Sequence, residues 1–444
     1  WLKSMSAYRS AAPASASNPL LQFFSYIGGT SIPPSHSLAA HWPSRTPQTL
    51  LAKMLSTNVV RSVRRAAVVA ATRRFAATFS QLSFKFPPAY TDIAKATKNE
   101  KRRTEIIATI GPSSWDPEVL QKLVSEGMNT IRCNMSHGDH DEQNMKLANL
   151  KKALEGMGKD PSQGKIKVMM DTRGPEIRTG YFEVYNSKKQ LKAGQDFTLV
   201  TDYSFKGDEN SVAVTYPHLA RDVKPGQIIL IQDGTVILEV KECGKGFVKC
   251  SVQNNCRLGE KKNVNLPGVK IDLPVVGERE INDIVNWAVP NKADYIALSF
   301  VQSAEDIKEC RKHCGDSIKI IAKIENVEGI ANFDEILEVA DGIMVARGDL
   351  GMEIPMEKIW MAQKWMIQKT RATSKIIVCA TEMLASMEDK PFPTRAEACD
   401  VANAVLDGSS MVMLSGEVAN GSFPVETLRT MRRIVEEAEN ALEE

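Results

Sequence analysis

The stretch IKIIAKIENVEGIANFDEILEVADGIMVA, residues 318–346, combines two strand patterns with a helix pattern between them. Residues 318–324 and 342–346 are short apolar runs of the length typical of strands. Residues 327–340 carry apolar side chains at helical spacing. Nearly continuous apolar strands that are joined by a helix are typical of parallel strands buried on both faces. This stretch therefore predicts one strand–helix–strand unit of an α/β fold.

The same alternation extends over most of the chain after residue 103. The predicted strands are 104–110, 130–135, 166–171, 294–300, 318–324, 342–346, 375–380 and 410–414. The predicted helices are 116–127, 139–156, 278–289, 303–314, 327–340, 357–373, 394–406 and 424–443. Eight such units predict a (β/α)8 TIM barrel.

One long insertion interrupts this alternation between the third strand and the next helix. Residues 173–275 contain short β-rich runs separated by turn sequences such as DGT, KPGQ and GKG. We predict an inserted small all-β barrel domain at 173–275, with the two parts of the TIM barrel at 92–172 and 276–444. The insertion follows the C-terminal end of a strand, which is the face where TIM barrels carry their active sites. We therefore expect it to be a mobile lid over the site.

The charge of the chain is unevenly distributed. The 444 residues have a net charge of +2, but residues 1–91 contain ten Lys or Arg and no Asp or Glu. The remaining residues have 46 bases and 54 acids, a net charge of −8. An acid-poor leader rich in Arg, Ser and Ala is typical of an organelle transit peptide. We expect 1–91 to be such a leader and the protein to be mitochondrial, with plastid and cytoplasm as alternatives.

Two other interpretations of this leader stay open. It is also compatible with a disordered basic tail, or with untranslated sequence upstream of a start at Met54, since Trp1 is not a natural initiator. A nucleic-acid-binding arm is disfavoured, because the rest of the chain is acidic and the leader has no repeated basic–aromatic pattern.

The composition excludes several other classes. It is close to that of an average globular protein, and no run of 18 apolar residues predicts a membrane-spanning helix. The eight cysteines form no CxxC pair, which favours a reducing compartment over a disulfide framework.

Polar residues follow seven of the eight predicted strands. Since apolar side chains suffice to fill a barrel, polar groups at C-terminal strand ends indicate a functional site. These residues are Arg132, Asn134, Ser136, Asp171, Thr172, Arg173, Ser299, Lys323, Glu325, Arg347, Asp349, Thr381, Glu382, Ser415 and Glu417, with Gly348 between Arg347 and Asp349.

The pair Lys323 and Glu325 gives the most specific chemical signal. The two residues are two positions apart on one strand, so both side chains point to the same face. Glu325 and Asp349 follow adjacent strands, and two carboxylates with open positions suit Mg²⁺, which keeps water and phosphate ligands. Lys323 beside such an ion would neutralise charge on a transferring phosphoryl group. An ion pair with a purely structural role is the alternative for Lys323 and Glu325.

A second cluster is rich in oxygen. Asn134, Ser136, Asp171 and Thr172 offer one carboxylate and several neutral oxygens, which suits a monovalent cation better than zinc or iron. No standard nucleotide-binding fingerprint is present, since GKDPSQGKI at 158–166 has the wrong spacing for a P-loop. Any nucleotide is therefore bound in another way.

These residues lie in segments that together resemble the pyruvate kinase family over residues 100–444. The segments are ATIGPSS (108–114), RCNMSHG (132–138), DTRGPEIRTG (171–180), NLPG (265–268), KIEN (323–326), DGIMVARGDLG (341–351), TEML (381–384), PTRAEACDVANAVLDG (393–408) and MLSGE (413–417). The resemblance implies phosphoryl transfer from phosphoenolpyruvate to ADP, which gives pyruvate and ATP in the last step of glycolysis.

The resemblance also implies a role for individual residues. The implied catalytic residues are Lys323, Thr381 and Arg132. The implied substrate-binding residues are Arg132, Lys323, Gly348, Asp349 and Thr381. The implied nucleotide-binding residues are Asn134, His137, Arg178 and Lys262. The implied ligands are Glu325 and Asp349 for Mg²⁺ or Mn²⁺, and Asn134, Ser136, Asp171 and Thr172 for K⁺.

The resemblance leaves alternatives for function and assembly. The family has a further C-terminal domain with an effector site and part of a tetramer interface, which we expect to be absent from these 444 residues. A homo-oligomer is the expected assembly. The alternatives to a pyruvate kinase are a catalytically silent or regulatory subunit and another phosphoenolpyruvate-using barrel enzyme.

Overall fold

A computed structural model describes residues 102–158 and 166–442, which belong to one compact unit of the chain. The predicted basic leader, 1–91, lies outside the described residues. None of the helices in the described part has both the length and the apolar character of a membrane span.

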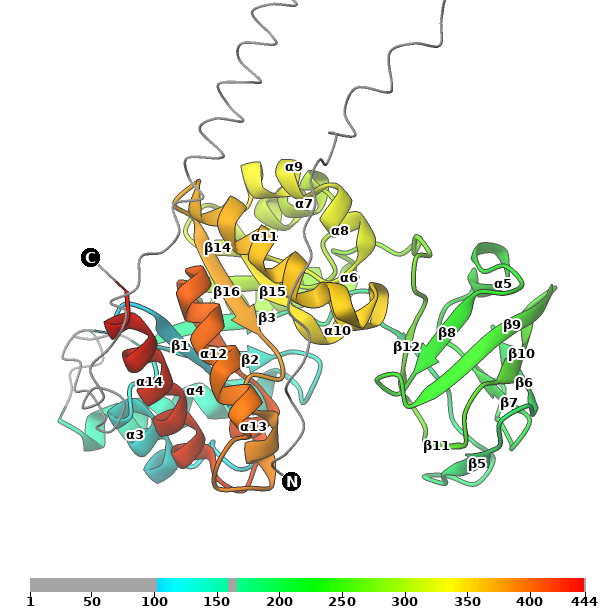
Figure 1. Cartoon of the computed structure of the whole chain (residues 1–444), viewed down its shortest axis with the longest axis horizontal. Coiled ribbons are helices and arrows are strands. Elements are labelled where there is room, and N and C mark those ends of the chain that lie inside the picture. Colours follow the sequence, from blue (N-terminus) through cyan, green and yellow to red (C-terminus); the bar gives the residue numbers. More distant parts are fainter. Residues whose placement is uncertain (1–101, 159–165, 443–444) are drawn as a thin grey trace, which may run out of the picture. The chain divides into compact units, whose positions relative to one another are not determined.

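Eight parallel strands of the described residues close into a barrel, in the order β1-β17-β16-β15-β14-β13-β3-β2 (Figure 1). The strands are β1 (Glu105–Thr109), β2 (Thr130–Asn134), β3 (Lys167–Asp171), β13 (Tyr295–Leu298), β14 (Lys319–Ile324), β15 (Gly342–Ala346), β16 (Ile376–Ala380) and β17 (Met411–Leu414). The first and last strands pair with each other, with Ile107 opposite Met413. The predicted TIM barrel is therefore confirmed.

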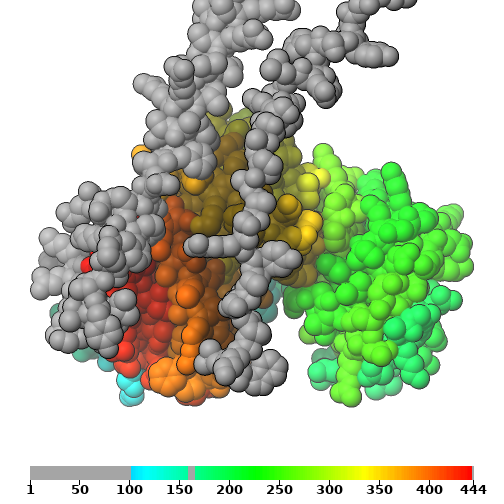
Figure 2. Space-filling view, in the orientation of Figure 1, coloured from blue at the N-terminus to red at the C-terminus, as the bar shows by residue number. Residues whose placement is uncertain are grey.

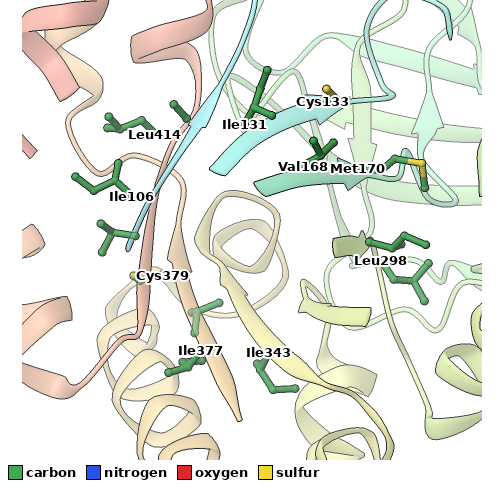
Figure 3. Close-up of a cluster of buried hydrophobic side chains, with 14 of the residues drawn as sticks. Ile106, Ile131, Cys133, Val168, Met170, Leu298, Ile343, Ile377, Cys379 and Leu414 are labelled. Atoms are coloured by element: carbon green, nitrogen blue, oxygen red, sulfur yellow. The ribbon is translucent and has the colours of Figure 1, made fainter. Parts of the chain in front are cut away.

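Alternate residues of these strands face opposite sides, as strand geometry requires. One set fills the inside of the barrel with buried side chains such as Ile107, Met169, Ile321 and Met344. The other set points outward and packs against the surrounding helices. Figure 3 labels ten residues of this set: Ile106, Ile131, Cys133, Val168, Met170, Leu298, Ile343, Ile377, Cys379 and Leu414. Because the inward set continues past the strand ends, residues of the same parity reach the mouth of the barrel.

The helices cover the outside of the barrel. They are α3 (Pro117–Ser125), α4 (His140–Gly156), α6 (Glu278–Asp283) with the π-helical turn η2 (Ile284–Ala288), α7 (Ala304–Cys314), α8 (Val327–Ala331), α9 (Phe333–Val339), α10 (Arg347–Glu353), η3 (Met356–Lys358), α11 (Ile359–Arg371), η4 (Ala385–Glu388), α12 (Arg395–Asp407), α13 (Gly416–Ala419) and α14 (Pro424–Asn440). Helices α12 and α14 pack side by side in the orange and red part of the surface (Figure 2).

The sequence predicts most of these helices but not their breaks. The predicted helix 327–340 is two helices, because Asn332 leaves the helical conformation, with φ −98° and ψ 16°, and begins α9. Thr394 and Glu397 form a full capping box at the start of α12, and at the start of α7 the Ser303 backbone N–H donates to Asp306 at 2.8 Å. Helix α10 follows β15 directly and precedes the predicted helix 357–373.

Residues 177–265 form the strands of the insertion. They are β4 (Ile177–Arg178), β5 (Lys189–Leu191), β6 (Asp196–Val200), β7 (Ser211–Ala213), β8 (Ile228–Ile231), β9 (Val236–Gly244), β10 (Phe247–Val252), β11 (Cys256–Leu258) and β12 (Asn263–Asn265), with the short helix α5 (Leu219–Asp222). Seven of them form a sheet in the order β4-β12-β8-β9-β10-β6-β7, and β5 pairs with β11. A bridge between Thr179 and Val214 joins the two ends of that order.

The insertion has its own hydrophobic core. Phe197, Leu199, Ile229, Leu238 and Val248 are fully buried in it. This cluster is separate from the clusters of the TIM barrel. The segment therefore has the apolar interior expected of a small domain.

Candidate active site

The carboxylate of Asp171 lies at the centre of the barrel mouth. It is buried, and its two oxygens accept a bond from Arg132 Nε at 2.7 Å and from Lys323 Nζ at 2.9 Å. Arg132 also donates to the Thr109 hydroxyl at 2.9 Å. Burial alone would raise the pKa of Asp171, but the two cations outweigh burial and lower it. Asp171 therefore stays ionised between two positive side chains.

Lys323 is the central cation of this network. Its ammonium lies 2.9 Å from Asp171, 3.1 Å from Glu325 and 2.7 Å from the Ser299 hydroxyl. Burial disfavours its charged form, but the two carboxylates more than offset burial and raise the pKa of Lys323. Each of its three protons has an acceptor, so the side chain is held in one orientation.

Glu325 and Asp349 bring the negative charge of the site above the positive charge of Arg132 and Lys323. The backbone N–H of Phe300 donates to Glu325 at 2.7 Å. Burial, opposed by Lys323, raises the pKa of Glu325. Burial and the nearby Glu325 raise the pKa of Asp349 to about 7.

This surplus negative charge fits a divalent cation. Glu325 is buried and Asp349 half-buried, and two carboxylates whose ionised forms are disfavoured would be stabilised by an ion such as Mg²⁺, which prefers oxygen ligands. Among the described residues, no group of three or more His, Cys, Asp or Glu side chains is arranged to hold a metal ion. The position thus offers two protein carboxylates and leaves the other ligand positions to water or substrate.

The four residues predicted for K⁺ lie at the C-terminal ends of the adjacent strands β2 and β3, or just beyond them, and Asn134 is opposite Asp171. The Asn134 side-chain oxygen accepts the N–H of Ser136 at 3.0 Å. The Thr172 hydroxyl oxygen accepts the N–H of Ser299 at 2.9 Å, and the Thr172 carbonyl accepts the Ser299 hydroxyl at 2.7 Å. The oxygens suit a monovalent cation chemically, although those of Asn134, Asp171 and Thr172 already have hydrogen-bond partners. The potassium site stays a prediction.

Gly348 and Thr381 are in close contact on the opposite side of the mouth. A Cβ atom on Gly348 would lie 2.8 Å from the Thr381 methyl carbon, Cγ2, which is closer than such atoms pack. Thr381 has a φ of 75°, in the left-handed region that β-branched residues rarely adopt. Glycine at 348 therefore allows Thr381 to lie directly against the start of α10.

Two cavities contain the predicted site residues. One, of about 480 Å³, is lined by residues that include Arg132, Asn134, Lys323, Glu325 and Thr381. The other, of about 350 Å³, is lined by residues that include Arg178 and Lys262. His137 and Asp349 line both cavities. The structure thus brings the predicted substrate and magnesium residues together, and divides the predicted nucleotide residues between two adjoining cavities.

Arg178 and Lys262 belong to the insertion. Arg178 is paired with Glu176 at 2.6 Å and donates to the Lys261 carbonyl at 2.9 Å. Its strand β4 pairs with β12, which begins one residue after Lys262. Both cations therefore lie at one end of the small sheet.

Sequence reasoning missed two residues of these cavities. Thr109 ends β1 and accepts from Arg132, and its position at a strand end was the signal that could have identified it. Glu353 lies at the end of α10, where the backbone N–H groups of Leu266 and Gly268 bond its carboxylate. Burial and the nearby Glu328 raise the pKa of Glu353 to about 7. No sequence pattern marks Glu353, because its partners are distant in the chain.

Comparison with known proteins assigns the family. The family model described as the pyruvate kinase barrel domain matches residues 101–428. The chain belongs to the pyruvate kinase family. It is 52% identical to a pyruvate kinase of Eimeria tenella over 344 residues, which are 77% of this chain and 64% of that protein. This pyruvate kinase family member therefore spans about two thirds of the length of that relative.

Other relatives agree. A probable cytosolic pyruvate kinase of Arabidopsis thaliana is 49% identical, over 78% of this chain and 69% of that protein. A crystal structure of a pyruvate kinase from Cryptosporidium parvum matches with a TM-score of 0.73 and 46% identity, over 80% of this chain and 72% of that one. These two matches thus support the same family, and the second also supports the same fold.

The contact between Gly348 and Thr381 predicts a pair of compensating substitutions. Gly348→Ala would place a methyl group against Thr381 Cγ2, which costs about 1–3 kcal/mol when it cannot be relieved. Thr381→Ser removes that methyl carbon and keeps the hydroxyl. Phosphoenolpyruvate is the substrate that the resemblance to the family implies. We expect Gly348→Ala to weaken its binding, measured by calorimetry, and the double variant to recover most of it.

Gly351→Ala is the matched control, because the nearest atom to a Cβ there is 3.8 Å away. It should bind like the wild type. Equal weakening in the single and double variants would contradict the steric explanation.

The raised pKa of Glu353 predicts a pH-dependent stability. The unfolded chain loses this proton near pH 4.5, whereas the folded chain keeps it until about pH 7. The protonated form of Glu353 therefore contributes its full stabilisation of the fold below pH 4.5, and this contribution is lost as the pH rises to about 7. Glu353→Gln stays neutral and should become the more stable protein above pH 7, by about 1 kcal/mol after allowance for partial exposure.

The measurement is the thermal midpoint from pH 5 to 8, with Glu357→Gln as control on the exposed turn that follows. The difference between Glu353→Gln and wild type should grow with pH. A constant difference would show that burial does not disfavour the ionised carboxylate.

Proposed function

We propose that this protein is a pyruvate kinase, which transfers the phosphoryl group of phosphoenolpyruvate to ADP. The observation that carries the proposal is the buried ammonium of Lys323, held between Asp171 and Glu325 at the mouth of the barrel. Phosphoryl transfer depends mainly on positioning and on stabilising negative charge. The family assignment supports the same reaction.

In this proposal the cations of the mouth bring two anionic substrates together. Arg132 binds the phosphoryl group of phosphoenolpyruvate, and Lys323 stabilises the charge that this group develops during transfer. Gly348, Asp349 and Thr381 hold the rest of the substrate. Arg178 and Lys262 bind the nucleotide from the adjoining cavity, Asn134 binds it from the substrate cavity, and His137 lines both cavities.

Two cations are part of the proposal. Mg²⁺ or Mn²⁺ would be held by Glu325 and Asp349, and K⁺ by Asn134, Ser136, Asp171 and Thr172. Bound there, the ions supply positive charge that neutralises the phosphates. The protein itself supplies the fixed orientation of Lys323 and a buried site at the barrel mouth.

Transfer leaves an enolate, which must take up a proton to become pyruvate. The Thr381 hydroxyl is the proposed donor route, together with water, because a hydroxyl of ordinary pKa is a weak acid alone. The insertion would act as a lid that excludes bulk water and so protects the phosphoryl group from hydrolysis.

The test is pyruvate production from phosphoenolpyruvate and ADP, coupled to lactate dehydrogenase, with and without Mg²⁺ and K⁺. Cation-dependent production supports the proposal. Pyruvate formed without ADP indicates another phosphoenolpyruvate-using enzyme. No turnover by a folded protein that binds phosphoenolpyruvate indicates a silent or regulatory subunit.

The role of Lys323 predicts a large loss of activity on substitution. Lys323→Met should lower kcat at least about 10²-fold, the scale for removing one charge-stabilising group. Lys319→Met is the control, since Lys319 lies exposed at the other end of the same strand. The coupled assay measures both variants, with thermal midpoints to verify folding. Unchanged turnover in Lys323→Met would rule out the proposed role.

We further propose that the protein is mitochondrial, because of the Arg-rich and acid-poor leader. Residues 54–91 fused to a fluorescent reporter should direct it to mitochondria. A variant with Arg61, Arg64, Arg65, Arg73 and Arg74 changed to Gln should leave the reporter in the cytosol. A cytosolic location of the unchanged fusion would contradict this proposal, and a plastid location would select the alternative.

A further inference from the structure

Thr381 is held in a backbone conformation that its side chain disfavours. Its φ is 75°, and that of the next residue, Glu382, is 54°. In this left-handed region the Cβ atom crowds the carbonyl oxygen, and a β-branched residue is a genuine outlier there. Such a residue is strained and persists only where its surroundings impose the conformation. The surroundings of Thr381 therefore have to hold it.

Arg347 makes the hydrogen bonds that hold the backbone of Thr381. Its guanidinium donates to the Thr381 carbonyl from Nη2 at 2.6 Å and from Nε at 3.1 Å. Nε also lies 3.3 Å from the Ala380 carbonyl, and Nη2 lies 3.0 Å from the sulfur of Met383. One planar group thus contacts three residues of the segment that contains Thr381.

The same guanidinium is anchored on two helices. Its Nη1 atom donates to Asp400 of α12 at 2.7 Å and to Gln363 of α11 at 3.3 Å. The arginine side chain is only 9% exposed. Because the fork is rigid and its donors point in fixed directions, the two helices fix the position of the Thr381 carbonyl. A lysine has one flexible donor group and cannot bridge these partners in the same way.

Gly348 limits the movement of the Thr381 side chain. The Thr381 methyl carbon lies 2.8 Å from the position of a Cβ on Gly348. Gly348 directly follows Arg347 in α10, so one short segment supplies both the hydrogen bonds to the Thr381 carbonyl and the surface against its side chain. The orientation of the Thr381 hydroxyl thus depends on Arg347 through the backbone of Thr381.

We propose that Arg347 is a positioning residue that holds the left-handed backbone of Thr381 and so sets the direction from which the enolate is protonated. The inference rests on the proposed function. In that step the electron pair of the enolate double bond forms the new C–H bond of the methyl group, and the enolate oxygen becomes the ketone oxygen. The proton leaves the Thr381 hydroxyl, or water bound to it, and the hydroxyl regains a proton from water.

The reverse of this step can be measured without phosphoryl transfer. Pyruvate in D₂O loses methyl protons to solvent when the enzyme forms the enolate, and ¹H NMR follows the loss. The sample contains the full chain, Mg²⁺, K⁺ and inorganic phosphate in place of the phosphoryl group. We expect Arg347→Lys to lower the exchange rate roughly 10- to 100-fold, less than the ~10²–10⁴-fold of a whole acid–base group, because the hydroxyl remains.

Two further variants separate positioning from folding. Asp400→Asn weakens the anchor of Arg347 and should lower exchange in the same direction by a smaller factor. Arg311→Met removes an arginine that also bonds backbone carbonyls and an aspartate, Asp341, but near the N-terminal ends of the strands. It should lower the thermal midpoint and leave exchange per folded molecule unchanged.

Kinetics add a second readout. In the coupled assay, Arg347→Lys should lower kcat and leave the KM for ADP within about twofold of wild type, since the nucleotide residues are untouched. This inference alone would be overturned if the wild-type protein transfers the phosphoryl group and folded Arg347→Lys still exchanges methyl protons at the wild-type rate. Absence of both exchange and transfer in the wild type would overturn the proposed function and this inference with it.

Discussion

The buried contact of Asp171 with Arg132 and Lys323 is the interaction on which the site depends. Three charged side chains from three strands meet out of water, at 2.7 and 2.9 Å. Buried charges are tolerated only when they are paired with good geometry, and removal of one partner leaves the others uncompensated. The barrel must therefore close in one register, with Asn134 opposite Asp171, for these groups to meet.

The remaining carboxylates explain why a site of this kind calls for additional cations. Lys323 faces both Asp171 and Glu325, and Asp349 adds a third carboxylate nearby. The raised pKa values of Glu325 and Asp349 show that the protein alone does not balance this charge. The same surplus would favour binding of a divalent ion together with anionic substrates.

Much of the barrel and its site could be predicted from sequence because both follow local rules. The eight strands are apolar runs, and the period of two places Lys323 and Glu325 on one face. What was missed depends on tertiary contacts. The break at Asn332 and the hydrogen bonds of Glu353 to Leu266 and Gly268 are set by partners that no local pattern shows. The left-handed conformation of Thr381 could likewise not be predicted, because the sequence around it contains no glycine to indicate it.

The most direct test of the central claim is a ³¹P NMR time course of phosphoenolpyruvate and ADP with the purified chain, Mg²⁺ and K⁺. It observes both substrates and the product without a coupling enzyme. The charge network described above predicts that the phosphoenolpyruvate signal falls as the γ-phosphate signal of ATP rises in equal amount. Release of inorganic phosphate in place of ATP, or no change with folded protein, would contradict a site built for phosphoryl transfer.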